Sequence, residues 1–238
     1  MAIDYISQEQ LARNALYENI SERVNYLLKD HSSIRLLEAG CGSATYVNFK
    51  QVIESVGIDI SKEQLARNAF IKEKIHGDIQ TFPLPLEEFD VVICWDVLEH
   101  LPDPMMALKN FFKTLRKRGI LILAFPNLLS FKGFLTKLTP FWFHNLFYRA
   151  VGYQNKPFPT CFRFSIRPDH LRKYVISNGF TIEYNLMKEG FGQKRIRNRF
   201  LAVDIFLSSL DLLIKDLTFC RLDSFLLDYC VMIFRKTR

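Results

Sequence analysis

Residues 36–44 read LLEAGCGSA, an apolar run that ends in a glycine, a cysteine and a second glycine. The run IRLLEA at residues 34–39 has the length and apolar content of a short buried strand. A glycine turn at the carboxyl end of such a strand lets the backbone approach a ligand closely, and a following helix offers its amino end to polar or anionic groups. The stretch therefore predicts a ligand cradle, with a purely structural tight turn as the alternative.

Helix-like and strand-like segments alternate on both sides of this turn. Apolar residues at helical spacing predict helices over residues 8–29, from the glycine turn to about residue 55, over 61–74, and over 104–118, where Gly119 would end the last one. Short apolar runs predict strands at residues 34–39, 55–60, 74–79, 89–95 and 119–126. This alternation indicates an α/β fold with a doubly wound, parallel sheet covered on both faces.

Length and composition limit the class of protein. The chain has 238 residues, of which 49% are hydrophobic, enough for one globular domain with a full core. No export signal is visible at the start, and the apolar run GILILAF is too short to span a bilayer. The 5 cysteines are an odd number without CxxC spacing, so neither a disulfide framework nor a metal site is expected. A cytoplasmic protein is the expectation.

An acid on the next strand points to the kind of ligand. Asp59 ends the second predicted strand about 20 residues after the glycine turn, where an acid can accept hydrogen bonds from ribose hydroxyls. The dinucleotide fingerprint fails, however, because Thr45 stands where its third glycine belongs. The pattern therefore favours a nucleoside cofactor other than NAD.

Four motifs in order resemble class I S-adenosylmethionine-dependent methyltransferases of the small-molecule type. The first motif, acid-x-G-x-G-x-G, is met by Glu38, Gly40 and Gly42, with Ala44 at the last glycine. The others are VGIDIS, HGDI and FDVVICWDVLEHLPDP. The resemblance implies a Rossmann-like, doubly wound, seven-stranded mixed sheet of order 3-2-1-4-5-7-6, in which GFTIEYNLM and DYCVMIFRK form the last pair and the final strand is antiparallel.

The resemblance also implies S-adenosylmethionine as cofactor, with S-adenosylhomocysteine as product, and assigns residues to its parts. Gly40, Gly42 and the backbone of Cys41 would approach the methionine portion, in a turn shaped by Glu38. The remaining assignments are Asp59 for the ribose, Ile60 and Ile79 for the adenine ring, Asp78 for the adenine amino group, Cys94 and Trp95 for the cofactor floor, and Asp96 for the same cleft. Cys41 and Cys94 as small core fillers, and Trp95 as a core aromatic, are the alternatives.

The predicted organisation is a single methyltransferase domain over residues 1–238. It has an N-terminal helix at 1–30, a lid insertion at 126–167 and a helical insertion at 190–226 before the last strand. The apolar residues of the second insertion would either cover the core or form a surface-binding face. The lid is unusual because residues 125–164 hold 12 aromatic residues among 40. Lids of this length are commonly functional elements.

Charge is unevenly distributed, and it gives the best clue to the acceptor. Residues 104–168 contain 11 Lys and Arg and no Asp or Glu. Those that follow the fifth predicted strand surround the expected substrate approach: Lys132, Lys137, Arg149, Lys156, Arg163 and Arg167. A basic, aromatic lid favours an anionic or membrane-associated acceptor and peripheral contact with a membrane.

Three functions remain open at this stage. The favoured one is an O-methyltransferase for a small-molecule or lipid-type acceptor, with His100 or His144 as the base that takes the hydroxyl proton. A nucleic-acid methyltransferase is less expected, because WDVLEH stands where a base-methylating NPPY-like tetrad would follow the fourth strand. A non-catalytic S-adenosylmethionine-binding protein is the third possibility. Neither the oligomeric state nor the acceptor atom follows from the sequence.

Overall fold

The computed structural model describes residues 2–127, 130–131, 133, 164–190, 193–194, 197–198, 200–218 and 225–237. Its strands are β1 (Ser33–Ala39), β2 (Val52–Asp59), β3 (Glu73–His76), β4 (Phe89–Trp95), β5 (Leu115–Pro126), β6 (Phe180–Lys188) and β7 (Tyr229–Lys236). They form one seven-stranded sheet in the order β3-β2-β1-β4-β5-β7-β6. β7 is antiparallel to β5 and β6, whereas the other neighbours are parallel. This topology confirms the predicted fold.

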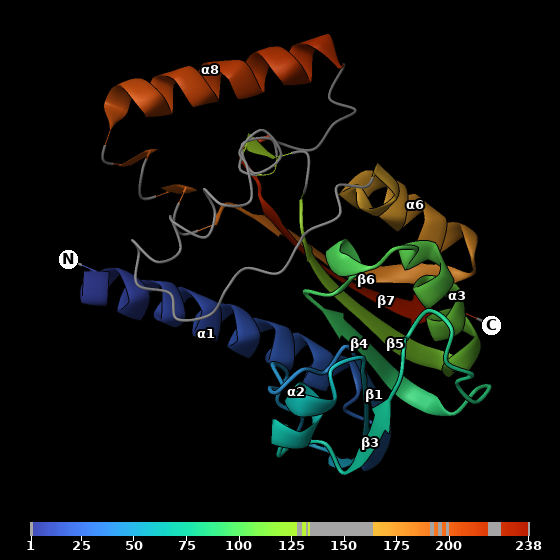
Figure 1. Cartoon of the computed structure of the whole chain (residues 1–238). Helices are drawn as coiled ribbons and strands as arrows, with labels where there is room; N and C mark the ends of the chain where they lie inside the picture. The colour runs from blue at the N-terminus through green and yellow to red at the C-terminus, as the bar shows by residue number, and fades with distance from the viewer. Residues whose placement is uncertain are drawn as a thin grey trace.

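Helices cover both faces of the sheet (Figure 1). On one face, Ile20 of α1 (Ala2–Leu27) joins a fully buried cluster with Ile93 of β4. On the other face, Phe111 of α3 (Pro104–Thr114) and Leu171 of α6 (Pro168–Ser177) join a cluster with Val92. Because neighbouring strand residues point to opposite faces, Val92 and Ile93 mark the two layers. Each such buried side chain stabilises the fold by about 1.5 to 3 kcal/mol.

The crossover from β1 to β2 differs from the sequence prediction. A helix was expected there, but residues 40–51 form turns and irregular backbone. Side chains of α1 bond this segment instead: Asn48 N donates to Ser21 Oγ at 2.9 Å, and Lys50 N donates to Asn25 Oδ1 at 2.8 Å. Val47 is buried in the cluster that α1 shares with the sheet. The crossover needs no helix because α1 already covers this face.

The end of α3 also differs from the prediction. Asp103 caps its start as expected, accepting from Met105 N at 3.0 Å. The helix ends at Thr114 rather than before Gly119, and β5 starts at once with the buried Leu115. Residues 116–118 are therefore strand residues at the amino edge of the sheet, where Arg116 pairs with Asp90 at 2.9 Å.

The remaining short helices and the insertion before β7 lie at the carboxyl edge of the sheet. The short helix α2 (Lys62–Arg67) follows β2, the 3-10 turn η1 (Leu98–His100) follows β4, and η2 (Phe164–Ile166) precedes α6. β6 ends at Lys188 opposite Tyr229, where β7 begins, so the insertion that carries α8 (Leu201–Leu217) leaves and returns at this edge. Figure 1 shows α8 at the top of the view, apart from the helices that cover the sheet.

The predicted lid is only partly within the described residues. Most of the lid, including Lys132, Lys137, Arg149, Lys156 and Arg163, lies outside them. Arg167 is described: it precedes α6 and forms an ion pair with Asp169 at 2.7 Å. Among the helices in the described ranges, none combines the length and apolar character needed to cross a bilayer.

Candidate active site

The glycine turn follows β1 and has the left-handed backbone that glycine favours. Gly40 has φ +72° and Gly42 has φ +49°. A Cβ atom added to Gly40 would lie 2.4 Å from Val97 Cγ2, and Gly40 N donates to Ile58 O at 2.8 Å. Glycine is thus required at position 40 by backbone conformation and by close packing against Val97, just after β4. The sequence alone had indicated only the approach of a ligand as the reason for this glycine.

Asp59 and Asn68 clamp this turn. The Asp59 carboxylate accepts from Gly42 N at 2.8 Å and from Ser61 N at 2.7 Å. Asn68, at the end of α2, donates from Nδ2 to Cys41 O at 3.2 Å and to Gly42 O at 3.3 Å. Both amide and carbonyl groups of the turn are therefore bonded by side chains. An ionised carboxylate can accept about four hydrogen bonds, so Asp59 retains capacity for a ligand.

A small hollow opens beside the turn. Its lining residues are Glu38, Ala39, Gly40, Cys41, Ala44, Tyr46, Ile93 and Trp95. Glu38 is buried, and Thr45 Oγ1 donates to its Oε2 at 3.0 Å, but within the described part of the chain Oε1 has no hydrogen-bond partner. Burial raises the pKa of Glu38 to about 7. The indole Nε1 of Trp95 is likewise buried without a partner there. Two residues that line the hollow thus carry one buried acceptor and one buried donor without a partner among the described residues.

Two tyrosines pack around Trp95 on the side of this hollow. Tyr46, from the segment after the turn, lies 5.6 Å from Trp95 between ring centroids, and Tyr17 of α1 lies 5.5 Å from it. The two tyrosine rings are 5.1 Å apart. Burial raises the pKa of both tyrosines. The N-terminal helix therefore packs against two residues that line the hollow.

The residues predicted for the adenine differ in exposure. Ile60 follows β2 and is 73% exposed, which is unusual for isoleucine. Asp78 is half-buried and accepts from Gln80 N at 2.9 Å. Ile79 is buried in the core, and its carbonyl oxygen accepts from Asn110 Nδ2 of α3 at 3.0 Å. The loop after β3 is thus attached to α3 and leaves Ile60 open to solvent.

Acidic groups gather beyond the end of β4. Asp96 has φ +53°, a conformation that aspartate adopts more readily than most residues, and Tyr229 Oη donates to its Oδ1 at 2.8 Å. Glu99 is buried, and burial, together with the nearby Asp96 charge, raises its pKa to about 8. Burial also raises the pKa of Cys94, which is fully buried.

Of the two candidate bases, the structure describes His100 but not His144. His100 ends η1 with a side chain about one-third exposed, and its Nε2 lies 3.8 Å from Glu99 Oε1. His144 lies outside the described residues. His100 therefore neighbours the buried acids at the end of β4.

The comparison with protein families decides the identity. A sequence profile described as "Methyltransferase domain" matches residues 9–185. The chain belongs to this family of class I S-adenosylmethionine-dependent methyltransferases. The match includes all four sequence motifs, and S-adenosylmethionine is the cofactor of the family.

Individual relatives of this methyltransferase are distant. A probable S-adenosylmethionine-dependent methyltransferase of Mycolicibacterium smegmatis is 32% identical over 112 residues, 44% of each chain. A ubiquinone biosynthesis O-methyltransferase of Aliivibrio fischeri is 26% identical over 113 residues, 41% of this chain and 47% of its own. The chain spans about half the length of the curated relatives it matches. An S-adenosylmethionine-dependent methyltransferase from Mesorhizobium loti is 15% identical with a TM-score of 0.54, covering 89% of this chain and 94% of its own, which shows the shared fold.

Several site residues of this methyltransferase were not found from the sequence. Tyr17 lies in α1 and Asn68 just after α2, and in the sequence no pattern distinguishes them from their neighbours. Tyr229 bonds Asp96 across 133 positions of the chain. Tyr46 lies two residues after Ala44, the last position of the first motif. This closeness to the motif was the one sign in the sequence that Tyr46 belongs to the site.

Proposed function

We propose that this chain transfers a methyl group from S-adenosylmethionine to a hydroxyl group of a small-molecule or lipid-type acceptor. The observation that carries the proposal is the hollow beside the glycine turn, where Glu38 Oε1 and Trp95 Nε1 are buried and unsatisfied among the described residues. Buried polar groups normally have partners, so this pair favours a polar ligand as the missing partner.

The available groups fit the methionine and ribose portions of the cofactor. The unsatisfied oxygen of Glu38 suits an ammonium group, while Gly40, Cys41 and Gly42 provide the turn beside it. Asp59 is assigned to the ribose hydroxyls because its carboxylate has lone pairs left after bonding Gly42 and Ser61.

The remaining cofactor assignments follow the carboxyl edge of the sheet. Ile60 would cover one side of the adenine, which explains its exposure in the free chain. Asp78 and Ile79 are assigned to the adenine amino group and ring edge, Cys94 and Trp95 to the floor, and Asp96 to the boundary with the acceptor.

When bound, S-adenosylmethionine would supply an electrophilic methyl carbon, and its sulfonium sulfur would leave with the electrons of the broken carbon–sulfur bond. A hydroxyl acceptor that takes this methyl group must lose its proton to the protein. His100 is proposed to take that proton, with His144 as the second candidate. Tyr229 and Asp96 would orient the acceptor, because positioning alone can lower such a barrier by about 7 to 11 kcal/mol.

The acceptor class is proposed to be anionic or membrane-associated, with the protein cytoplasmic and in peripheral contact with a membrane. The basic, acid-free stretch of residues 104–168 supports an anionic acceptor. The likeness to a ubiquinone biosynthesis O-methyltransferase supports oxygen as the methylated atom.

A transfer assay tests this proposal. The full chain is incubated with methyl-labelled S-adenosylmethionine and, separately, with polyprenylated catechols, hydroxybenzoates and RNA. We expect label on the phenolic oxygen of one of the first two classes and none on RNA. Label only on RNA would replace the proposal with the nucleic-acid methyltransferase. The His100→Ala variant tests the base. If it binds the cofactor in calorimetry and is still fully active, His100 is not the base.

A further inference from the structure

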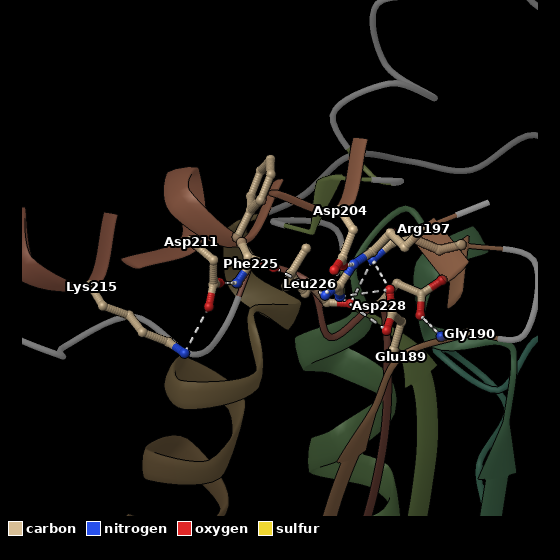
Figure 2. Close-up of polar contacts among 11 residues, drawn as sticks. Glu189, Gly190, Arg197, Asp204, Asp211, Lys215, Phe225, Leu226 and Asp228 are labelled. Atoms are coloured by element: carbon tan, nitrogen blue, oxygen red, sulfur yellow. Dashed lines mark hydrogen bonds and ion pairs between the residues drawn. The ribbon is translucent and has the colours of Figure 1, made fainter. Parts of the chain in front are cut away.

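Helix α8 is held to the protein by its polar residues (Figure 2). Arg197 donates from Nε to Asp204 Oδ1 at 2.7 Å and from NH1 to Glu189 at 3.1 Å, which joins the helix to the end of β6. Asp211 is buried, accepts from Phe225 N at 2.7 Å and pairs with Lys215 at 2.7 Å. These contacts fix which side of α8 faces the body of the protein.

The opposite side of α8 is apolar and exposed. Seven large apolar side chains there are each 52% to 72% exposed: Phe200, Leu201, Ile205, Phe206, Leu212, Leu213 and Leu217. At 100° per residue, those of the helix itself lie within an arc of about 160°. A surface helix normally turns its apolar stripe toward the core and its charges toward water. α8 buries Leu207 toward the body of the protein but exposes a second apolar stripe along its whole length. This apolar face of α8 therefore needs a partner outside the described structure.

The charges around this face favour one kind of partner. Asp204 and Asp211 are paired with Arg197 and Lys215, which leaves Asp216 as the acid on the exposed side. The stretch just before the helix, residues 188–199, has one acid, Glu189, and five basic residues: Lys188, Lys194, Arg195, Arg197 and Arg199. Glu189 and Arg197 pair with each other, so the other four basic residues give the stretch its positive charge. A basic stretch joined to an apolar helical face is the composition of an interfacial membrane helix.

A second copy of the chain is a weaker candidate for the same face. Stable protein interfaces use about 20 to 30 residues a side, whereas this face is a single stripe of seven large apolar residues. A bilayer surface needs no matching shape and accepts such a stripe directly. Because no described helix can span a membrane, α8 would lie in the plane of the surface.

We propose that the apolar face of α8 docks the protein on the surface of an anionic lipid bilayer. The insertion leaves β6 at Lys188 and returns at Tyr229, the residue that bonds Asp96. Docking through α8 therefore brings the carboxyl edge of the sheet near the membrane. This inference does not depend on methyl transfer and is tested without it.

Vesicle co-sedimentation of the full chain provides the test. The probes are vesicles of phosphatidylcholine alone and vesicles with about 30% phosphatidylglycerol, at about 0.1 M and 0.5 M salt. The disrupting variant is Phe206→Ser with Leu213→Ser. The matched control is Phe70→Ser with Leu86→Ser, because Phe70 and Leu86 are 67% and 73% exposed and lie outside α8, in the segments that precede β3 and β4.

The proposal expects wild type and control to bind anionic vesicles equally, with weaker binding to phosphatidylcholine and at high salt. The α8 variant should bind about tenfold or more weakly, since it removes two side chains that enter the apolar boundary. Equal binding by both variants, or no binding by wild type, would overturn the proposal. So would a wild-type dimer in light scattering that only the α8 variant dissociates, because the face would then be a protein interface.

Discussion

The two sides of the carboxyl edge of the sheet are built in different ways. Around the glycine turn, Asp59 and Asn68 bond the backbone of Cys41 and Gly42 and so fix its shape. Beyond β4, side chains interact with each other: Tyr229 bonds Asp96, and Glu99 is buried beside that acid. The first region is a backbone turn whose shape is fixed by side-chain hydrogen bonds, and the second is a group of titratable side chains in contact with each other. We expect the turn to govern cofactor affinity and the acidic region to govern transfer.

The largest effect is expected from a side chain at Gly40. Gly40→Ala combines a positive φ with a Cβ only 2.4 Å from Val97, so we expect a loss of about 3 kcal/mol or more in unfolding free energy and no measurable S-adenosylhomocysteine binding. Gly40→Val should be worse. Gly179→Ala is the matched control, because Gly179 has φ +86° but its added Cβ meets only Thr237 at 3.7 Å. It should lose about 1 to 2 kcal/mol and bind normally. Equal losses in denaturant titrations would show that packing against Val97 is unimportant.

Asp59→Ala is expected to act on affinity as well as on folding. The variant loses the acceptor for Gly42 N and the proposed ribose acceptor, so S-adenosylhomocysteine binding should weaken by about 1.5 to 3 kcal/mol. The control is Asp90→Ala at the opposite edge, where Asp90 also accepts a backbone amide, from Arg35 at 2.8 Å. Calorimetry should find its affinity unchanged despite a similar loss of stability. If both variants lose affinity alike, the effect of Asp59 is only structural.

Glu99→Gln is expected to change how stability depends on pH. The raised pKa of Glu99 keeps its carboxyl protonated in the folded chain up to about pH 8, whereas an unfolded glutamate has its ordinary pKa of 4.5. Between these values the folded state binds more protons, so the stability from this group falls as pH rises. In thermal melts, the stability of the variant relative to wild type should rise by about 3 kcal/mol between pH 5 and pH 8.5. The exposed Glu54→Gln should show no such gain, and parallel curves for Glu99→Gln would contradict the burial argument.

Tyr229→Phe should give the smallest of these effects. It removes the hydroxyl that bonds Asp96, at a cost of about 0.5 to 1.5 kcal/mol in stability, and leaves every group of the glycine turn in place. Turnover should fall while S-adenosylhomocysteine affinity stays constant. A variant with weaker cofactor binding and normal turnover would reverse the proposed division between the two regions.

The order and position of the strands could be predicted from the sequence, because the buried strands are short apolar runs and the motifs lie at the ends of strands. It failed where distant segments decide local structure. The expected helix after the glycine turn is absent because Ser21 and Asn25, on a helix earlier in the chain, bond that backbone. The pairing of Tyr229 with Asp96 depends on the position of β7 in the sheet. Helical spacing likewise marked the apolar residues near 201–217 without showing that they face outward.

The central claim is that the cofactor binds in the hollow between the glycine turn and Trp95. The chain has 2 tryptophans, so an amide-correlation NMR spectrum has few indole signals, and Trp95→Phe assigns the one of interest. Titration with S-adenosylhomocysteine should shift the Trp95 indole signal and the Gly42 amide signal together and saturably. Binding detected by calorimetry while both signals stay in place would contradict the claim and locate the cofactor elsewhere.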